Sequence, residues 1–263
     1  GIRSEAIQAE HYKTGAIDKP VISYGILRGV DAIYKDAARL GVEWWNIDKG
    51  FFKASHPDGY YRIGCRHLQP LFRKGAAVDA SRWKALHLDI LPWKDRNGGY
   101  TLLCPPTRAI ATFYGIPYTS EEGPAAWIDS TTERLPAILR ARIKVRKKGD
   151  QEDLGTALDG AAYVVTHSSG VAMEALRMGI PAVADEGIVQ SWNGLALEEA
   201  DYDFTRLNRE ALFYYAAWCQ FTQNEIRSGK AWKACRAVQL GETVRARPPT
   251  AKSVRGKRGS IRG

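Results

Sequence analysis

The sequence predicts an α/β fold of two Rossmann-like halves, and three observations support this class. Short apolar runs alternate along the chain with stretches of helical periodicity. Glycines and prolines separate these runs at the positions expected for turns. The chain has 263 residues, 44% of them hydrophobic, which suffices for a sizeable core. These properties exclude a disordered or collagen-like chain.

The first predicted elements form a βαβ unit. An apolar run at residues 21–24 predicts a strand, and the glycine-containing segment 25–29 predicts a turn. Residues 31–40 have apolar side chains at helical spacing, with Gly41 just beyond the end. A second strand is expected at 44–47, followed by Asp48. This order is typical of parallel strands joined by a helical crossover.

A second α/β series begins after the Asn97–Gly99 turn. Its elements alternate between short apolar runs and helical segments, and Asn208 is a suitable N-cap for a long apolar helix. We expect strands at 100–104, 142–148, 163–166 and 181–184, and helices at 125–139, 154–158, 171–178 and from Asn208 to about Phe221.

The predicted organisation is an N-terminal Rossmann-like half at residues 1–98, a C-terminal Rossmann-like half with closing helices at 99–244, and a disordered tail at 245–263. The whole chain has a net charge of +9. The tail contributes seven of these charges and contains no acid; its basic residues are Arg245, Arg247, Lys252, Arg255, Lys257, Arg258 and Arg262. Such a tail is typical either of a solubilising terminus or of a segment that contacts nucleic-acid phosphates.

Other sequence features narrow the class of protein. The chain has no apolar run long enough for a transmembrane helix, and its first residues resemble a trimmed or tag-derived terminus. The four cysteines form no CxxC pair, and the spacing of His56, Cys65 and His67 matches no zinc pattern. We therefore expect a cytoplasmic protein without a bound metal.

The most informative segment runs from residue 164 to residue 181. A buried strand ends there in His167, Ser168, Ser169 and Gly170, and a helix that contains Glu174 follows. Unpaired backbone N–H groups at the start of a helix favour phosphate, and glycine allows a ligand to approach the backbone closely. Helix capping by a serine explains part of this pattern but not the whole of it.

This segment resembles the donor site of GT-B glycosyltransferases. The resemblance covers about residues 140–190 and implies a compact GT-B-like arrangement of the two halves. It also implies that the C-terminal half binds a nucleotide-sugar donor and that the N-terminal half binds the acceptor. Ser168, Ser169 and Gly170 would bind the diphosphate of the donor, Glu174 would bind its ribose, and His167 would belong to the same donor-binding site. A UDP-sugar is the expected co-substrate, and no tightly bound cofactor is implied.

A basic segment precedes this region. Arg142, Lys144, Arg146 and Lys148 alternate, which places them on one face of a predicted strand. Charged faces also protect edge strands from pairing. The leaving diphosphate of a sugar transfer requires positive charge, so we predict that Arg146 is catalytic and that Lys148 binds the donor.

The N-terminal half supplies candidates for the acceptor side. Arg28 follows the first strand, where α/β sheets bind ligands, and we expect it to contact the acceptor. Asp48 follows the second strand and is the candidate general base. A turn-forming role is the alternative for Asp48, and His56, Asp89 and Asp31 are rival bases.

Residues 218–222 and 228–232 resemble phage-encoded proteins that are similar to glycosyltransferases. The resemblance implies transfer of a hexose or pentose to a hydroxymethylated pyrimidine of double-stranded DNA, in the cytoplasm of a host cell. Arg245, Arg247, Lys252, Arg255, Lys257 and Arg258 would bind the DNA. A glycan or lipid acceptor and a non-catalytic nucleic-acid-binding role are the alternatives. The sequence predicts neither the sugar nor the oligomeric state.

Overall fold

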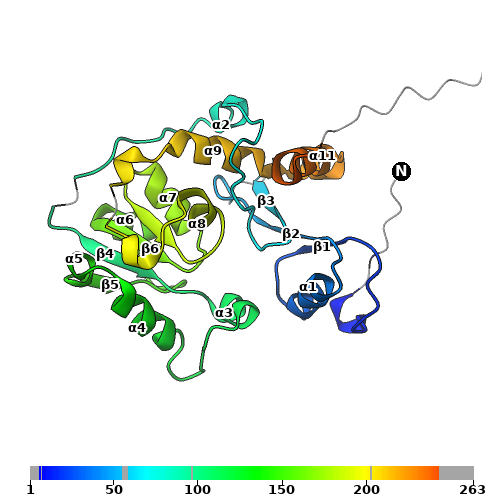
Figure 1. Ribbon diagram of the computed structural model, residues 1–263, viewed down its shortest axis with the longest axis horizontal. Coiled ribbons are helices and arrows are strands. Elements are labelled where there is room, and N and C mark those ends of the chain that lie inside the picture. The colour runs from blue at the N-terminus through cyan, green and yellow to red at the C-terminus, as the bar shows by residue number, and fades with distance from the viewer. Residues whose placement is uncertain (1–5, 7, 55–58, 96, 202, 243–263) are drawn as a thin grey trace, which may run out of the picture.

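The computed structural model describes residues 6, 8–54, 59–95, 97–201 and 203–242, and it contains two four-stranded β-sheets (Figure 1). Sheet A has the strand order β1 (Val21–Tyr24), β2 (Trp44–Lys49), β3 (Tyr60–Cys65) and β8 (Gln220–Thr222). Sheet B has the strand order β5 (Ile143–Val145), β4 (Tyr100–Cys104), β6 (Ala161–Thr166) and β7 (Ala182–Ala184). The protein is therefore an α/β protein with two sheets.

Eleven α-helices lie within the described residues. They are α1 (Val30–Arg39), α2 (Ser81–Lys84), α3 (Arg108–Tyr114), α4 (Ala125–Arg134), α5 (Ala137–Arg140), α6 (Leu154–Asp159), α7 (Val171–Arg177), α8 (Ile188–Asn193), α9 (Arg209–Trp218), α10 (Gln223–Arg227) and α11 (Lys230–Cys235). Short 3₁₀ turns are formed by η1 (Ala9–His11), η2 (Leu197–Glu199) and η3 (Phe204–Arg206), and η4 (Arg236–Leu240) is a π-helical segment.

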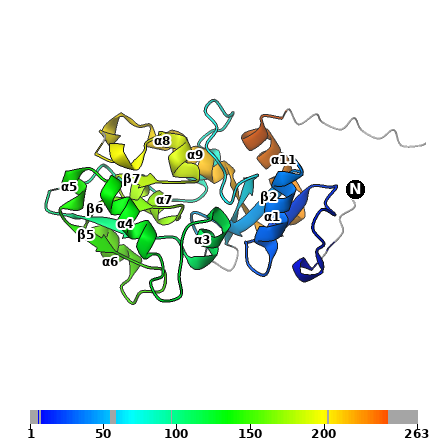
Figure 2. The same ribbon diagram turned by 60° about the horizontal axis from the view of Figure 1, so that its bottom comes forward.

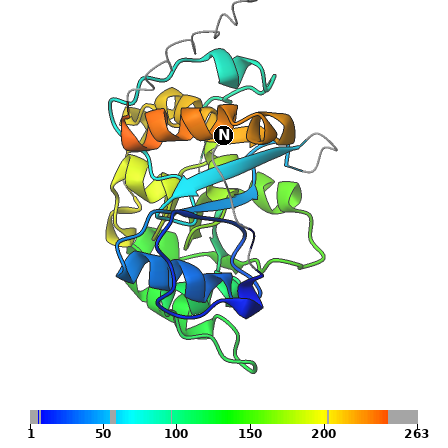
Figure 3. The same cartoon turned by 90° about the vertical axis from the view of Figure 1, so that its right-hand side faces the viewer.

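Sheet A is a mixed sheet with a helical layer on each face. Strands β1 and β2 are parallel and are joined by α1, whereas β3 is antiparallel to both of its neighbours. The rings of Tyr34 on α1 and Trp44 stack on one face at 4.4 Å, and Trp45 meets Trp232 of α11 on the other at 4.7 Å. Figure 3 shows the strands of sheet A between α11 and α1.

Sheet B is entirely parallel and has the more extensive core. Its central strands carry continuous apolar runs, as expected for strands that are covered on both faces. Leu102 and Val164 pack with residues of α6 and α7, and Leu103 and Val165 pack with Leu135 and Leu139 beside α4 and α5. The predicted βαβ unit and the parallel second series are thus present.

The two sheets are connected by elements that cross between them. Helix α3 follows β4 but lies beside α1 in both views (Figures 1 and 2), and Lys35 of α1 donates to the carbonyl of Thr112 on α3 at 3.2 Å. The chain returns to sheet A after α9 through β8. The predicted boundary near Gly98 therefore falls between the sheets, but later residues complete sheet A.

Several predicted elements differ from the observed ones. Only sheet B is fully parallel, so the N-terminal half is not a regular Rossmann unit. The helix expected at 125–139 is interrupted because Leu135 precedes Pro136 and adopts an extended conformation. The strand expected at 142–148 is limited to β5. The long helix after Asn208 ends at Trp218, because the following residues pair with β3 as β8.

Candidate functional site

The candidate site lies at the carboxyl ends of the strands of sheet B. Along the chain, β4 connects to β5 on one side, while β6 lies on the other side and connects onward to β7. The direction of winding therefore reverses between β4 and β6. Ligands of open α/β sheets bind at such a position. The loop after β6 is the segment that the sequence singled out.

This loop is fixed by hydrogen bonds to the ends of the strands. Thr166 Oγ1 donates to the carbonyl of Cys104 at the end of β4, at 2.7 Å, and accepts the backbone N–H of Ser169 at 3.3 Å. Ser169 Oγ accepts the backbone N–H of Val171, the first residue of α7, at 3.3 Å. Ser169 therefore contributes to capping, while Ser168 and Gly170 remain partly exposed.

Arg62 of β3 brings sheet A to this loop. Its Nη2 donates to Oδ2 of Asp48 at 2.7 Å, and the two residues are cross-strand partners. A Cβ atom added to Gly170 would lie 3.8 Å from Nη1 of Arg62. The φ angle of Gly170 is −60°, so any residue can adopt its backbone conformation. The absence of a side chain at Gly170 instead keeps the space beside Arg62 open.

Arg62 and Arg146 share an unusual property. Both have a buried Nε atom without a hydrogen-bond partner among the described residues. Buried donors are rarely left unpaired in folded proteins, and each such case requires an explanation. Arg62 is held over the ring of Phe51 at 5.0 Å, with only 14% of its side chain exposed. A guanidinium fixed in this way is prepared for an anionic ligand.

Arg146 lies directly after β5, at the same edge of sheet B. Its backbone N–H donates to the carbonyl of Leu103 at 2.9 Å, and its Nη2 donates to the carbonyl of Glu152 at 3.0 Å. Strand β4 separates β5 from β6, so two strand spacings, about 10 Å, separate Arg146 from the loop after β6. This span is comparable to the length of a nucleotide diphosphate.

A second set of contacts joins the two sheets through His67. Its Nδ1 accepts the backbone N–H of Gln69 at 3.3 Å, which assigns the proton of the neutral ring to Nε2. That nitrogen lies 3.1 Å from Oε2 of Glu186 and 3.2 Å from the hydroxyl of Tyr114. Gln69 also donates to the carbonyl of Ser168. Gln69 therefore links the segment after β3 to the loop after β6, and His67 links it to Glu186 after β7 and to Tyr114 of α3.

His167 is nearly buried, with 5% of its surface exposed. Its ring packs edge-on against Tyr114 at 4.7 Å, and its Nδ1 lies 3.1 Å from the hydroxyl of Ser168. Burial lowers the pKa of His167 to about 4, which the nearby Glu186 only partly offsets. The ring is therefore neutral at physiological pH and orients Ser168 without adding charge.

Asp185 supplies a further carboxyl group at this edge. Its backbone N–H donates to the carbonyl of Thr166 at 3.1 Å, and its Oδ2 accepts from the indole N–H of Trp127 at 2.9 Å. Burial raises the pKa of Asp185, although Trp127 and Arg134 oppose this effect. A carboxyl group with a raised pKa beside a ligand edge is a candidate for proton transfer.

Other predicted site residues have different surroundings. Both oxygens of Glu174 accept from Arg177 on the next turn of α7, so binding a ribose requires this ion pair to open. Lys148 is exposed in the turn after β5. Arg28 is exposed in the turn after β1 and has a φ angle of 59°, which is uncommon for a residue with a side chain. The predicted tail lies outside the described residues.

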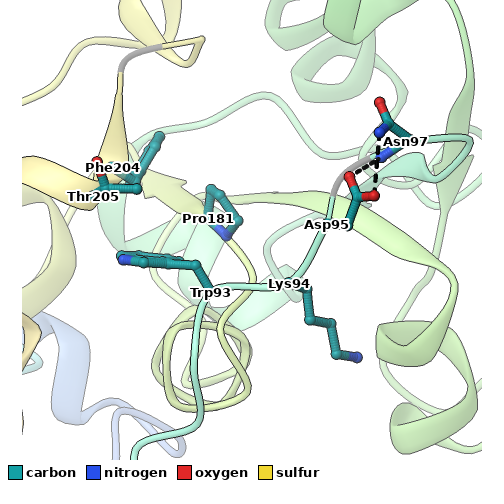
Figure 4. A pocket seen from close by; sticks show the side chains of 7 residues that line it. All are labelled: Trp93, Lys94, Asp95, Asn97, Pro181, Phe204 and Thr205. Atoms are coloured by element: carbon teal, nitrogen blue, oxygen red, sulfur yellow. Dashed lines mark hydrogen bonds between the residues drawn. The ribbon is translucent and has the colours of Figure 1, made fainter.

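Two cavities of the described residues lie away from the candidate site. One of about 280 Å³ lies at the amino ends of β4 and β7, opposite the candidate site, and is lined by Trp93, Lys94, Asp95, Asn97, Pro181, Phe204 and Thr205 (Figure 4). Asn97 donates twice to Asp95 beside it. Another, of about 240 Å³, lies beside α9 and the segment from Phe72 to Val78. None of the candidate site residues predicted from the sequence lines either cavity.

Sequence reasoning missed Arg62, Glu186 and Asp185 as site residues. Glu186 and Asp185 directly follow a predicted strand, and this position was the available signal. Arg62 had no comparable signal, because its role depends on the pairing of β3 with β2.

Within the described residues, no cluster of three or more His, Cys, Asp or Glu side chains is arranged to hold a metal ion. Among the same residues, no helix has the length and apolar character needed to cross a membrane. No model of a protein family matches the sequence, and a search of curated proteins finds no significant match.

Proposed function

We propose that the protein is a glycosyltransferase that transfers a sugar from a nucleotide-sugar, such as a UDP-sugar, to a hydroxymethylated pyrimidine in double-stranded DNA. The two sheets and their helices would act as the halves of a compact GT-B arrangement. The donor would bind at the carboxyl edge of sheet B, and the acceptor would enter from sheet A. A base within a duplex must first be rotated out of the stack to reach such a site.

The observation that carries this proposal is the position of Arg62 between Asp48 and Gly170. A guanidinium with an unpaired Nε faces a small-residue loop at the point where the winding of sheet B reverses. Anionic diphosphates suit this combination of a fixed cation and exposed loop atoms. The carboxylate of Asp48 lies on the other side of the same guanidinium, within the reach of an acceptor that approaches from sheet A.

The chemistry requires one bond to form and one to break. The hydroxymethyl oxygen of the acceptor attacks C1 of the sugar, and the bond between C1 and the oxygen of the β-phosphate breaks. The electron pair of that bond leaves with the nucleoside diphosphate, where Arg62 and Arg146 stabilise the developing negative charge. The proton of the acceptor hydroxyl passes to the carboxylate of Asp48. Ser168 and Gly170 would position the diphosphate.

The direct test is mass spectrometry of nucleosides from treated DNA. Duplexes that contain hydroxymethylcytosine or hydroxymethyluracil are incubated with the protein and a panel of nucleotide-sugars. We expect one modified nucleoside to gain the mass of a single sugar residue. Unmodified DNA is the acceptor control. Transfer to a glycan or lipid acceptor, or binding of DNA without any product, would contradict the proposal.

Asp48→Asn tests the assignment of the base. Asparagine keeps an oxygen that accepts from Arg62, so the variant should fold, yet it cannot take up the proton. Turnover should fall by about 100-fold or more, as for loss of a general base. Asp129→Asn, an exposed position on α4, is the matched control. Equal turnover of the two variants would exclude Asp48 as the base.

A further inference from the structure

An exposed apolar row lies on the outer strand of sheet A. Ile22 and Tyr24 on β1 are 52% and 57% exposed, and Leu27 in the turn that follows is 65% exposed. These are among the most exposed large hydrophobic side chains of the described residues. Burying such a row is favourable, so clustered exposure of this kind indicates a binding surface.

The sheet register explains why this row is uncovered. Ile22 pairs with Trp45, and Tyr24 pairs with Ile47, so these side chains share one face of sheet A. Helix α11 covers this face over Trp45, which is fully buried against Trp232. The cover ends before β1. The face of sheet A that is buried at Trp45 is therefore exposed to solvent at the outer strand β1.

Aromatic and basic side chains occur together on this face. The rings of Tyr24 and Tyr61 meet edge-on at 6.1 Å. Tyr61 of β3 pairs with Lys49 of β2, and Lys49 is exposed on the same face. Arg28 is exposed in the turn beyond Tyr24, next to Leu27. Exposed rings beside cations are typical of surfaces on which unpaired bases stack and phosphates are neutralised.

The residue that precedes the basic tail is linked through Arg236 to the segment before β2. Arg236 of η4 forms ion pairs with Glu43, at 2.6 Å, and with Glu242, the last described residue. The backbone carbonyl of Glu43 accepts from the N–H of Val21, the first residue of β1, at 2.9 Å. The segment 243–263, which contains seven basic residues and no acid, follows Glu242 in the sequence.

We infer that this face of β1, with Ile22, Tyr24, Tyr61 and Lys49, binds an unpaired strand of nucleic acid, and that the basic tail strengthens this binding through phosphate contacts. Bases stack on Tyr24 and contact Ile22, while Lys49 and Arg28 meet the backbone. The surface lies on the opposite face of sheet A from Asp48 and Arg62, because these alternate with Ile47 and Tyr61 along their strands. Binding of nucleic acid to this surface does not require the proposed function. Only the role of that nucleic acid as the sugar acceptor rests on it.

The test measures binding without any nucleotide-sugar. Fluorescence anisotropy of a labelled oligothymidine of about 12 nucleotides gives the affinity of the full chain. We expect Tyr24→Ala to weaken binding by about 5- to 100-fold, as for loss of one stacked base, and Tyr24→Phe to restore it. Ile22→Ser should weaken binding, whereas Ile138→Ser, at a 73% exposed position on α5, should not.

Truncation after Glu242 separates the surface from the tail. The truncated protein should bind more weakly and with a shallower salt dependence, yet still lose affinity when Tyr24 is replaced by Ala. Wild-type affinity in a folded Tyr24→Ala variant would overturn the inference. The inference would also be overturned if the protein did not bind the oligonucleotide but formed a dimer that Ile22→Ser abolishes. The apolar row would then bind a second copy of the chain.

These experiments distinguish failure of this inference from failure of the proposed function. Binding that depends on Tyr24 in a protein that transfers no sugar would support this surface and reject the transferase. Sugar transfer to DNA with binding that is independent of Tyr24 would support the transferase and reject this surface.

Discussion

Arg62 and Asp48 face each other across β3 and β2, with Nη2 of the arginine 2.7 Å from Oδ2 of the aspartate. Asp48 Oδ1 also accepts the backbone N–H of Lys49 at 2.8 Å, so the carboxylate is fixed in position. The pair orients the guanidinium toward Gly170. Sheet A thus brings to the loop of sheet B a guanidinium that is hydrogen-bonded to a carboxylate.

Replacing Arg62 with Met should impair turnover far more than folding. Methionine keeps much of the apolar contact with Phe51 but removes the charge that would contact the diphosphate in the proposed function. Loss of such a charge-assisted contact costs about 2–4 kcal/mol of transition-state stabilisation, which is a fall of about 30- to 1,000-fold in kcat/KM. Arg140→Met, at an exposed position on α5, is the control. Comparable kinetics in the two variants would show that Arg62 has only a structural role.

Arg146→Ala should also lower turnover. The activation barrier should rise by about 2–4 kcal/mol if the guanidinium of Arg146 contacts the leaving group. The hydrogen bond from Nη2 to the Glu152 carbonyl is lost as well, so thermal unfolding must be measured alongside the kinetics. Arg142→Ala, at an exposed position before β5, is the comparison. Normal turnover in a folded Arg146→Ala protein would reject its catalytic assignment.

Gly170→Val should abolish donor binding while the protein stays folded. The backbone conformation at Gly170 is open to any residue, and an added Cβ would make only an ordinary contact with Arg62. The larger valine side chain, however, fills the space between the loop and the guanidinium. Calorimetry with nucleotide-sugars measures the effect. Unchanged affinity in the folded variant would mean that this loop only caps α7.

His167 should make stability depend on pH. Burial lowers its folded-state pKa to about 4, below the value near 6.5 in an unfolded chain, so the unfolded state binds the proton more readily. The contribution is present above pH 6.5 and is lost as the pH falls toward 4, by about 3 kcal/mol in total. Urea unfolding between these pH values should show this loss in the wild type. His167→Asn should have a smaller slope, and parallel curves would contradict the assignment.

Deleting residues 243–263 should weaken binding to hydroxymethylated duplex DNA almost regardless of its sequence. Each phosphate contact contributes about 0.9 to the slope of log affinity against log salt, so the slope should fall by several units. Turnover at saturating DNA should change little, because none of the described site residues lies in the tail. Coincident salt slopes for the full and truncated proteins would identify the tail as a solubilising terminus.

The sequence predicts local elements better than their pairing. The strands at 21–24 and 100–104 are confirmed with the same bounds, because each is a compact apolar run between turn residues. The helix from Asn208 begins as predicted, with the Asn208 side chain accepting from the N–H of Ala211. Short strand β8 was missed, since three residues after a helix carry no periodic signal. Its existence depends on the pairing of Phe221 with Tyr61.

In the candidate site, too, the sequence predicts local segments better than contacts between segments that are distant in the chain. The loop from His167 to Gly170 was identified because a buried strand, small polar residues and a helix follow one another in sequence. The contribution of sheet A was identified only in Asp48. Arg62 and His67 could not be assigned from the sequence, because they reach the loop through the pairing of β3 with β2 and through the contacts of Gln69.

The most direct test of the proposed donor site is a calorimetric titration of the protein with a UDP-sugar, UDP and uridine. The proposed donor site would draw most of its binding energy from the diphosphate, through Arg62 and the loop that ends at Gly170. This proposal therefore predicts saturable binding of the UDP-sugar and UDP, much weaker binding of uridine, and loss of this difference in Arg62→Met. Equal affinity for UDP and uridine in the wild type, or a UDP affinity that Arg62→Met leaves unchanged, would contradict it.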